Sequence, residues 1–127
     1  AVLVGYSMGG YVALHLAAAH PERVAAVGTL GTKLAWTPEV AAREGARLDP
    51  AVMRAKVPRF ADALVARHAG AGGWEAVCAR TRALLAALGE APVVTPATLA
   101  AIAAPTRLMM GDRDATLSLD ETATAAR

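Results

Sequence analysis

Apolar residues predominate in three short stretches of the chain, at 1–4, 24–30 and 106–110. Runs of this length are typical of strands buried in a parallel sheet. Between the first two runs, residues 8–19 are rich in alanine and leucine and contain no proline, which predicts a helix. The helix is expected to end before Pro21, because the residue before a proline avoids helical dihedral angles. Strand, helix and strand in this order predict a βαβ unit with parallel strands.

Residues 36–104 follow a different pattern, in which apolar positions recur every three or four residues as in amphipathic helices. A helix is expected at 38–47 with Thr37 as its N-cap. The stripe of apolar residues that follows contains Pro58, which either kinks or interrupts the helix.

A glycine-rich break at 70–73 separates this stripe from a second one. The second stripe starts at Trp74, and its helix is expected to end at Gly89. A short helix through residue 101 completes the segment. The predicted division of the chain into core, helical segment and core is 1–35, 36–104 and 105–127.

Composition limits the classes of function. The chain has 127 residues, of which 55% are hydrophobic, so one domain can bury a core. Its 13 basic and 11 acidic residues give a net charge of +2, too even for a nucleic-acid-binding or polybasic membrane protein. No apolar run approaches the roughly 20 residues of a membrane span. The single cysteine, Cys78, excludes an internal disulfide, supports no metal cluster and is expected to be buried.

The ends of the sequence lead to an expectation about its extent. Ala1 lies inside a predicted strand and Arg127 inside a predicted helix, so we expect a piece of a longer protein. No targeting segment is visible, and the expected location is the cytoplasm. The pattern leaves the oligomeric state open.

The stretch Gly5-Tyr6-Ser7-Met8-Gly9 lies where the first strand passes into the first helix. A turn this sharp forces an unusual backbone conformation on its central residue, Ser7, and lifts the hydroxyl clear of both elements. Strand and helix come so close that Gly5 and Gly9 are expected to be needed for their lack of a side chain. The free N–H of Met8 points to the space beside Ser7 Oγ, where it can hold an oxyanion.

This stretch resembles the nucleophile elbow of α/β-hydrolases, G-x-S-x-G, and Gly10 adds freedom at the helix start. The alternative is a glycine-rich turn with an incidental serine, but the strand before and the helix after favour the elbow. The resemblance implies a partial α/β-hydrolase fold, a parallel sheet with helices on both faces. It also implies that 36–104 is a helical lid inserted between two strands. A helical layer on the sheet is the alternative, and the functional role of most long insertions favours the lid.

A second motif follows the third strand. Gly111 and Asp114 match the G-x-x-D that carries the acid of the catalytic triad in the resembled family. Asp112 matches a frequent acidic position of that loop and is expected to tie the turn. Two turn aspartates without a catalytic role are the alternative. Ser118 and Glu121 form a capping box, which predicts that a helix starts there.

The chain has no histidine after Asp114, where the resembled family places its general base. His15 and His20 lie about 12 Å and about 20 Å along the helix from Ser7 at ~1.5 Å per residue, too far for a hydrogen bond. His68 lies on an apolar stripe and is expected to be packed or exposed. We therefore expect this sequence by itself to have almost no catalytic activity. The catalytic histidine and a second oxyanion donor are expected in the longer parent protein.

The resemblance implies a serine hydrolase that cleaves carboxylic esters or related acyl bonds, with Ser7 as nucleophile and Asp114 as acid. Tyr6, Phe60 and Trp74 are expected to line the pocket for a small to medium, uncharged or weakly polar acyl substrate. No metal, organic cofactor, nucleic-acid partner or membrane partner is implied. Sibling activities stay open, namely C–C bond hydrolysis, lactone hydrolysis, thioester cleavage, acyl transfer and perhydrolysis. A non-catalytic small-molecule binding protein on the same scaffold also stays open.

Overall fold

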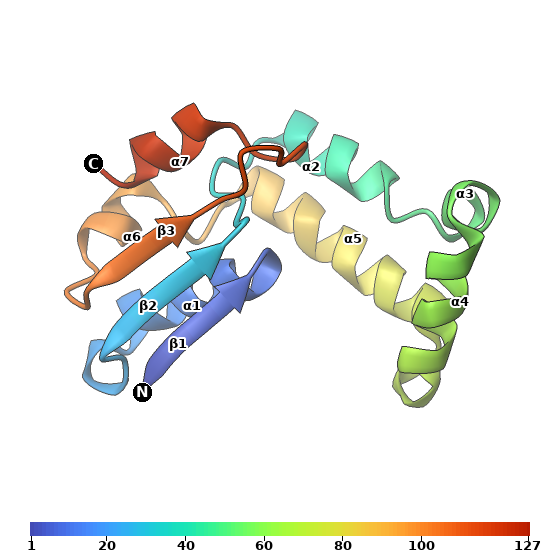
Figure 1. Cartoon of the computed structure of the whole chain (residues 1–127), viewed down its shortest axis with the longest axis horizontal. Coiled ribbons are helices and arrows are strands. Elements are labelled where there is room, and N and C mark those ends of the chain that lie inside the picture. Colours follow the sequence, from blue (N-terminus) through green and yellow to red (C-terminus); the bar gives the residue numbers. More distant parts are fainter. The chain divides into compact units, whose positions relative to one another are not determined.

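The computed structural model describes residues 1–127, the side chain of Ala71 excepted. The chain forms two compact units, each with its own secondary structure (Figure 1). The sheet unit comprises residues 1–35 and 93–127, and the helical unit comprises residues 36–92.

Three parallel strands form one sheet, in the order β1 (Val2–Tyr6), β2 (Ala26–Leu30) and β3 (Thr106–Met109). The crossover from β1 to β2 is helix α1 (Met8–Ala19), followed by a 3₁₀ turn (Pro21–Arg23). This arrangement confirms the α/β class, the three strands and their parallel pairing. The strands differ from the predicted runs only at their ends, and β1 extends to the residue directly before Ser7.

Helix α1 packs on β1 and β2 and supplies much of the core of the sheet unit. Its buried residues Tyr11, Leu14 and Ala17 recur every three positions, as expected for one face of a helix. The hydroxyl of Tyr11 accepts a hydrogen bond from the N–H of Val94 at 2.9 Å, which attaches the chain that returns to the sheet unit. Helix α6 (Pro96–Ala100) also packs on α1, so it belongs to this unit and not to the helical segment predicted for 36–104.

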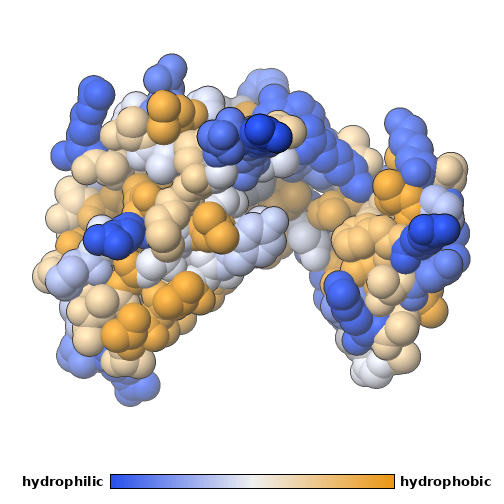
Figure 2. Space-filling model, in the orientation of Figure 1, coloured by the Kyte–Doolittle hydropathy of each residue, from blue (hydrophilic) through white to orange (hydrophobic). Residues whose placement is uncertain are grey.

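The opposite face of the sheet is apolar and exposed. Val2, Val4 and Tyr6 on β1 are 66%, 78% and 75% exposed, and Leu30 and Met109 on the neighbouring strands are also exposed. Figure 2 shows hydrophobic residues gathered over these strands. The second helical layer expected on this face is not formed by the residues that the structure describes.

The helical unit is built from α2 (Pro38–Ala46), α3 (Pro50–Lys56), α4 (Pro58–Arg67) and α5 (Trp74–Glu90). Thr37 caps α2 as predicted, because its hydroxyl accepts the N–H of Val40 at 3.3 Å. Pro58 interrupts its stripe instead of kinking one helix, since α3 ends two residues before it. Among the described residues, no helix is both long and apolar enough to cross a membrane.

Helix α5 was expected to end at Gly89 but ends one residue later. Helix α5 continues to Glu90, and Gly89 is buried where α5 meets α2. A Cβ on Gly89 would lie 2.7 Å from Ala41 Cβ and 3.0 Å from the carbonyl oxygen of Thr37. The glycine therefore permits close packing of two helices.

Trp74 lies in a small core of the helical unit with Met53, Ala61 and Cys78. The guanidinium of Arg54 lies over the indole ring, 4.9 Å from its centroid, in a cation–π contact. Burial raises the pKa of the Cys78 thiol, which favours the uncharged, structural form of this side chain. Cys78 is buried, as predicted.

Candidate functional site

Ser7 occupies the turn between β1 and α1 with φ 52° and ψ −120°. It is the one non-glycine residue of the described chain with a positive φ, a region that is costly for residues with a Cβ. The N–H of Ser7 donates to Leu30 O at 2.8 Å, and its carbonyl accepts from Thr32 Oγ1 at 3.0 Å. Although Ser7 is the N-cap of α1, its exposed hydroxyl makes no capping hydrogen bond. The unusual backbone conformation predicted for this residue is confirmed.

Two glycines let β1 and α1 approach each other at this turn. A Cβ on Gly5 would lie 2.3 Å from backbone atoms of Gly9 and Gly10. A Cβ on Gly10 would lie 1.9 Å from Thr32 Oγ1 and 3.0 Å from Thr29 Cβ, whereas one on Gly9 would meet no described atom within 4 Å. The steric requirement expected at Gly5 and Gly9 therefore falls on Gly5 and Gly10.

Replacing Ser7 with glycine is expected to stabilise the chain by about 1 kcal/mol. Relief of the left-handed conformation gives about 1–3 kcal/mol, and the greater freedom of glycine in the unfolded chain offsets part of it. Ser7→Ala keeps the strained Cβ and serves as the matched control, with little expected change. Urea denaturation measures both free energies of unfolding. A Ser7→Gly variant less stable than Ser7→Ala would show that the turn is not strained.

Met8 begins α1 and directly follows Ser7. The N–H groups of Gly10 and Tyr11 donate to the carbonyl of Ser7 and start the hydrogen bonding of the helix. The N–H of Met8 precedes them and belongs to the amides that a helix N-terminus leaves without an intrahelical partner. This amide adjoins Ser7, which is the position expected for the oxyanion donor.

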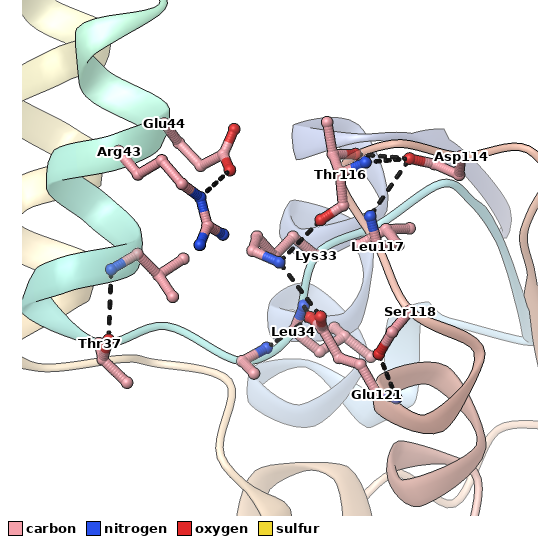
Figure 3. Close-up of polar contacts among 12 residues, drawn as sticks. Lys33, Leu34, Thr37, Arg43, Glu44, Asp114, Thr116, Leu117, Ser118 and Glu121 are labelled. Carbon is pink, nitrogen blue, oxygen red and sulfur yellow. Dashed lines mark hydrogen bonds and ion pairs between the residues drawn. The ribbon is translucent and has the colours of Figure 1, made fainter.

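Asp114, in the loop after β3, is partly buried and well hydrogen bonded (Figure 3). Its Oδ1 accepts from Thr116 Oγ1 at 2.7 Å, from Thr116 N at 2.8 Å and from Leu117 N at 3.3 Å. The hydroxyl and N–H of Thr116 hold the pKa of the Asp114 carboxyl below its usual value against the effect of burial, aided by Leu117 N–H and the charge of Lys33. Asp114 itself therefore ties the turn, a role predicted for Asp112, which is exposed.

The other oxygen of Asp114 lies close to the elbow. Oδ2 is 3.3 Å from the position of a Cβ on Gly31, and the same position is 3.5 Å from the ring of Tyr6. Gly31 directly follows β2 with φ 60°, and Tyr6 directly precedes Ser7. The Asp114 loop and the elbow thus lie at the same edge of the sheet, at the carboxyl ends of the strands, where open α/β sheets hold their sites.

The sheet unit places no histidine beside these groups. His15 and His20 are exposed, on α1 and at its end, and neither makes a hydrogen bond to Ser7 or Asp114 within the described residues. Instead, Nδ1 of His20 lies 3.9 Å from Oε1 of Glu22. In the helical unit, His68 is the C-cap of α4 and is partly buried.

The three residues expected to line a pocket have different surroundings. Tyr6 is exposed and adjoins the elbow, and Phe60 is 50% exposed on α4. Trp74 is only 2% exposed, because its ring packs within the core of its own unit. Their contact with a substrate stays a prediction, and Trp74 has the least free surface to offer.

A nearly buried ion pair between Lys33 and Glu121 was not predicted from the sequence (Figure 3). Lys33 Nζ lies 3.1 Å from Glu121 Oε2, and the side chains are 13% and 14% exposed. Glu121 Oε1 accepts the N–H groups of Leu34 and Ala35, each at 2.9 Å. Burial acts to raise the pKa of Glu121, but these N–H groups and the Lys33 ammonium outweigh it and lower that pKa.

Only half of the predicted capping box forms at α7 (Leu119–Ala125). Ser118 Oγ accepts the N–H of Glu121 at 3.1 Å, as predicted. The carboxylate of Glu121 does not return to Ser118 but binds residues that lie 86–88 positions earlier. In the sequence, Lys33 shortly after β2 gave only a weak indication of its ion pair with Glu121. Sequence patterns do not show which distant residues become partners.

A parallel sheet with a strained, uncapped serine at a strand-to-helix turn, and a hydrogen-bonded aspartate in a loop at the same edge, matches the arrangement expected from the sequence. The family model described as alpha/beta hydrolase fold matches residues 1–73, more than half of the chain. The chain therefore belongs to the α/β-hydrolase fold family. A search of curated proteins and a search of solved structures each found no match.

Proposed function

We propose that this protein hydrolyses carboxylic esters or closely related acyl bonds, with Ser7 as the nucleophile and Asp114 as the acid of a Ser-His-Asp triad. The observation that carries the proposal is the positive φ of Ser7. A chain that needed only the turn would be more stable with glycine there, so a serine with an unused hydroxyl supports a chemical role.

In the proposed reaction, Ser7 Oγ attacks the acyl carbon while a histidine takes its proton. The N–H of Met8 donates to the oxyanion that forms on the carbonyl oxygen. Asp114 orients the histidine and stabilises its charged form through Oδ2, since Oδ1 is occupied by Thr116 and Leu117. The histidine then protonates the leaving alcohol, and water releases the acyl group from Ser7 by the same steps.

The proposed mechanism needs a general base that the described residues of the sheet unit do not place beside Ser7. In the family order the histidine follows the acid, and residues 115–127 contain none. The 127-residue chain alone is therefore expected to hydrolyse esters close to the background rate. A form of the protein that includes the catalytic histidine is expected to turn them over.

The proposed substrate is small to medium-sized and uncharged or weakly polar in its acyl part. The support comes from the apolar surroundings of the elbow, where Tyr6 and Met8 flank the serine and no charged side chain adjoins it in sequence. Asp114 lies at this edge and is used by the proposed triad, and the nearby Lys33 is paired with Glu121.

Hydrolysis of p-nitrophenyl acetate and p-nitrophenyl butyrate tests the proposed function. Release of p-nitrophenol that depends on Ser7, in a form that includes the histidine, supports it. Absence of such release from either ester contradicts ester hydrolysis. Saturable binding of the esters without turnover would favour a binding protein on this scaffold.

A further inference from the structure

Thr116 holds the proposed catalytic acid from one side and is itself held from the other (Figure 3). Its N–H and hydroxyl both donate to Asp114 Oδ1. Its carbonyl accepts a hydrogen bond from Lys33 Nζ at 2.9 Å. A displacement of Lys33 therefore reaches the carboxylate of Asp114 through a single residue.

Lys33 is fixed in turn by Glu121. A free lysine side chain has many rotamers, and ordering it costs conformational entropy. Here one carboxylate oxygen of Glu121 pairs with Lys33 while the other accepts two N–H groups, from Leu34 and Ala35. Leu34 and Ala35 are the last residues of the sheet unit before the helical unit begins. Glu121 therefore ties the acid loop to the point where the chain leaves the sheet unit.

The pairing also keeps Lys33 away from the acid itself. Within the described residues, Lys33 donates to Thr116 and Glu121 and makes no hydrogen bond to Asp114. A lysine bonded directly to Asp114 would compete with a catalytic imidazolium for the same carboxylate. With Glu121 as its counter-ion, Lys33 supports the loop and leaves Asp114 Oδ2 available.

We propose that Lys33 and Glu121 are positioning residues that hold the Asp114 carboxylate in the orientation needed to bind the catalytic histidine. The proposal rests on the proposed function only for the role given to Asp114. Its experiment measures no turnover, so a failed esterase assay and a failed positioning test are separate results.

The test is the pKa of the Asp114 carboxyl in the 127-residue chain, followed by carbon-detected NMR, in Lys33→Met and Glu121→Gln. Both variants are expected to raise this pKa, because a loosened Thr116 donates less well to Asp114 Oδ1. The decisive variant is Glu121→Gln. Loss of a nearby negative charge alone would lower the pKa of Asp114, so a rise shows that the hydrogen bonds to Oδ1 were lost.

Two exposed residues of the helical unit supply matched controls, Lys56→Met and Glu90→Gln. Neither is expected to move the pKa of Asp114. A lowered or unchanged pKa in Glu121→Gln overturns the proposal, as does an equal rise in the controls. Glutamine keeps an acceptor oxygen for Leu34 and Ala35, so Glu121→Gln is expected to fold.

Amide hydrogen exchange of Glu121→Gln at neutral pH, where Asp114 stays ionised, gives a second measurement. Loss of the Glu121 charge is expected to speed exchange at Leu34, Ala35 and Thr116 together, relative to the unmodified chain. The expected acceleration is about 10- to 100-fold, the loss typical of a hydrogen bond to a charged group. Acceleration at Leu34 and Ala35 without Thr116 would overturn the proposed link to the acid loop.

Discussion

Replacing Ser7 with alanine is expected to lower ester hydrolysis at least about 10³-fold in a form of the protein that carries the catalytic histidine. The hydroxyl is the proposed nucleophile, and no neighbouring group in the elbow replaces it, since Tyr6, Met8 and the glycines lack an activated oxygen or sulfur. The measurement is kcat/KM for p-nitrophenyl butyrate.

The chain offers a matched control for this variant. Ser118, the other serine, caps α7 and is expected to tolerate alanine with a loss of about 1 kcal/mol of stability and no loss of turnover. Asp114→Asn is expected to lower kcat by about 10³- to 10⁴-fold, because it no longer fixes the histidine tautomer. If Ser7→Ala kept its activity, another residue would have to be the nucleophile, which would contradict the proposed function.

Replacing Gly5 with alanine is expected to destabilise the sheet unit by at least about 3 kcal/mol. The new Cβ would lie 2.3 Å from Gly9 C, Gly9 O and Gly10 N. All three are backbone atoms at the start of α1, so no side chain can rotate away. The turn must open, which separates α1 from β1 and exposes its buried face. Thermal and urea denaturation measure the loss.

Gly9→Ala is the matched control, because the two glycines flank the same serine. A Cβ on Gly9 would meet no described atom within 4 Å, and Gly9 lies in the first turn of α1. Alanine is expected to be neutral or to stabilise by about 0.5–1 kcal/mol through its better helix propensity. Equal losses in the two variants would show that the close approach at Gly5 is not what the turn requires.

Local patterns in the sequence were sufficient for the order of the elements. Helix α1 has the predicted bounds, and Thr37 caps its helix as predicted. Strands β2 and β3 lie within the predicted apolar stretches, and β1 overlaps its stretch and extends beyond it to Tyr6. These features depend on residues that are neighbours in the chain, such as a proline that stops a helix or a hydroxyl that caps one. The conformation of Ser7 was predictable for the same reason, since the sharp turn is contained within five residues.

Contacts between distant segments were decided only by the tertiary structure. Gly10 is needed because Thr29 and Thr32 pack against it, and Gly89 because α2 passes over it. Trp74 became a core residue through Met53 and Ala61 on other helices. A periodic stripe shows which side of a helix is buried, but it does not show what covers that side.

The proposed site shows the same division. The sequence by itself determined the serine, its turn and the loop of the proposed acid, because each is a short motif with a local backbone reason. Only the tertiary structure brought Asp114 close to Gly31 and Tyr6, and only it joined Glu121 to Lys33, Leu34 and Ala35. In the sequence, the capping box with the nearby Ser118 was a sufficient explanation for a glutamate at position 121. Its carboxylate binds an ammonium and two amide groups instead, because the fold places these donors together at a partly buried position.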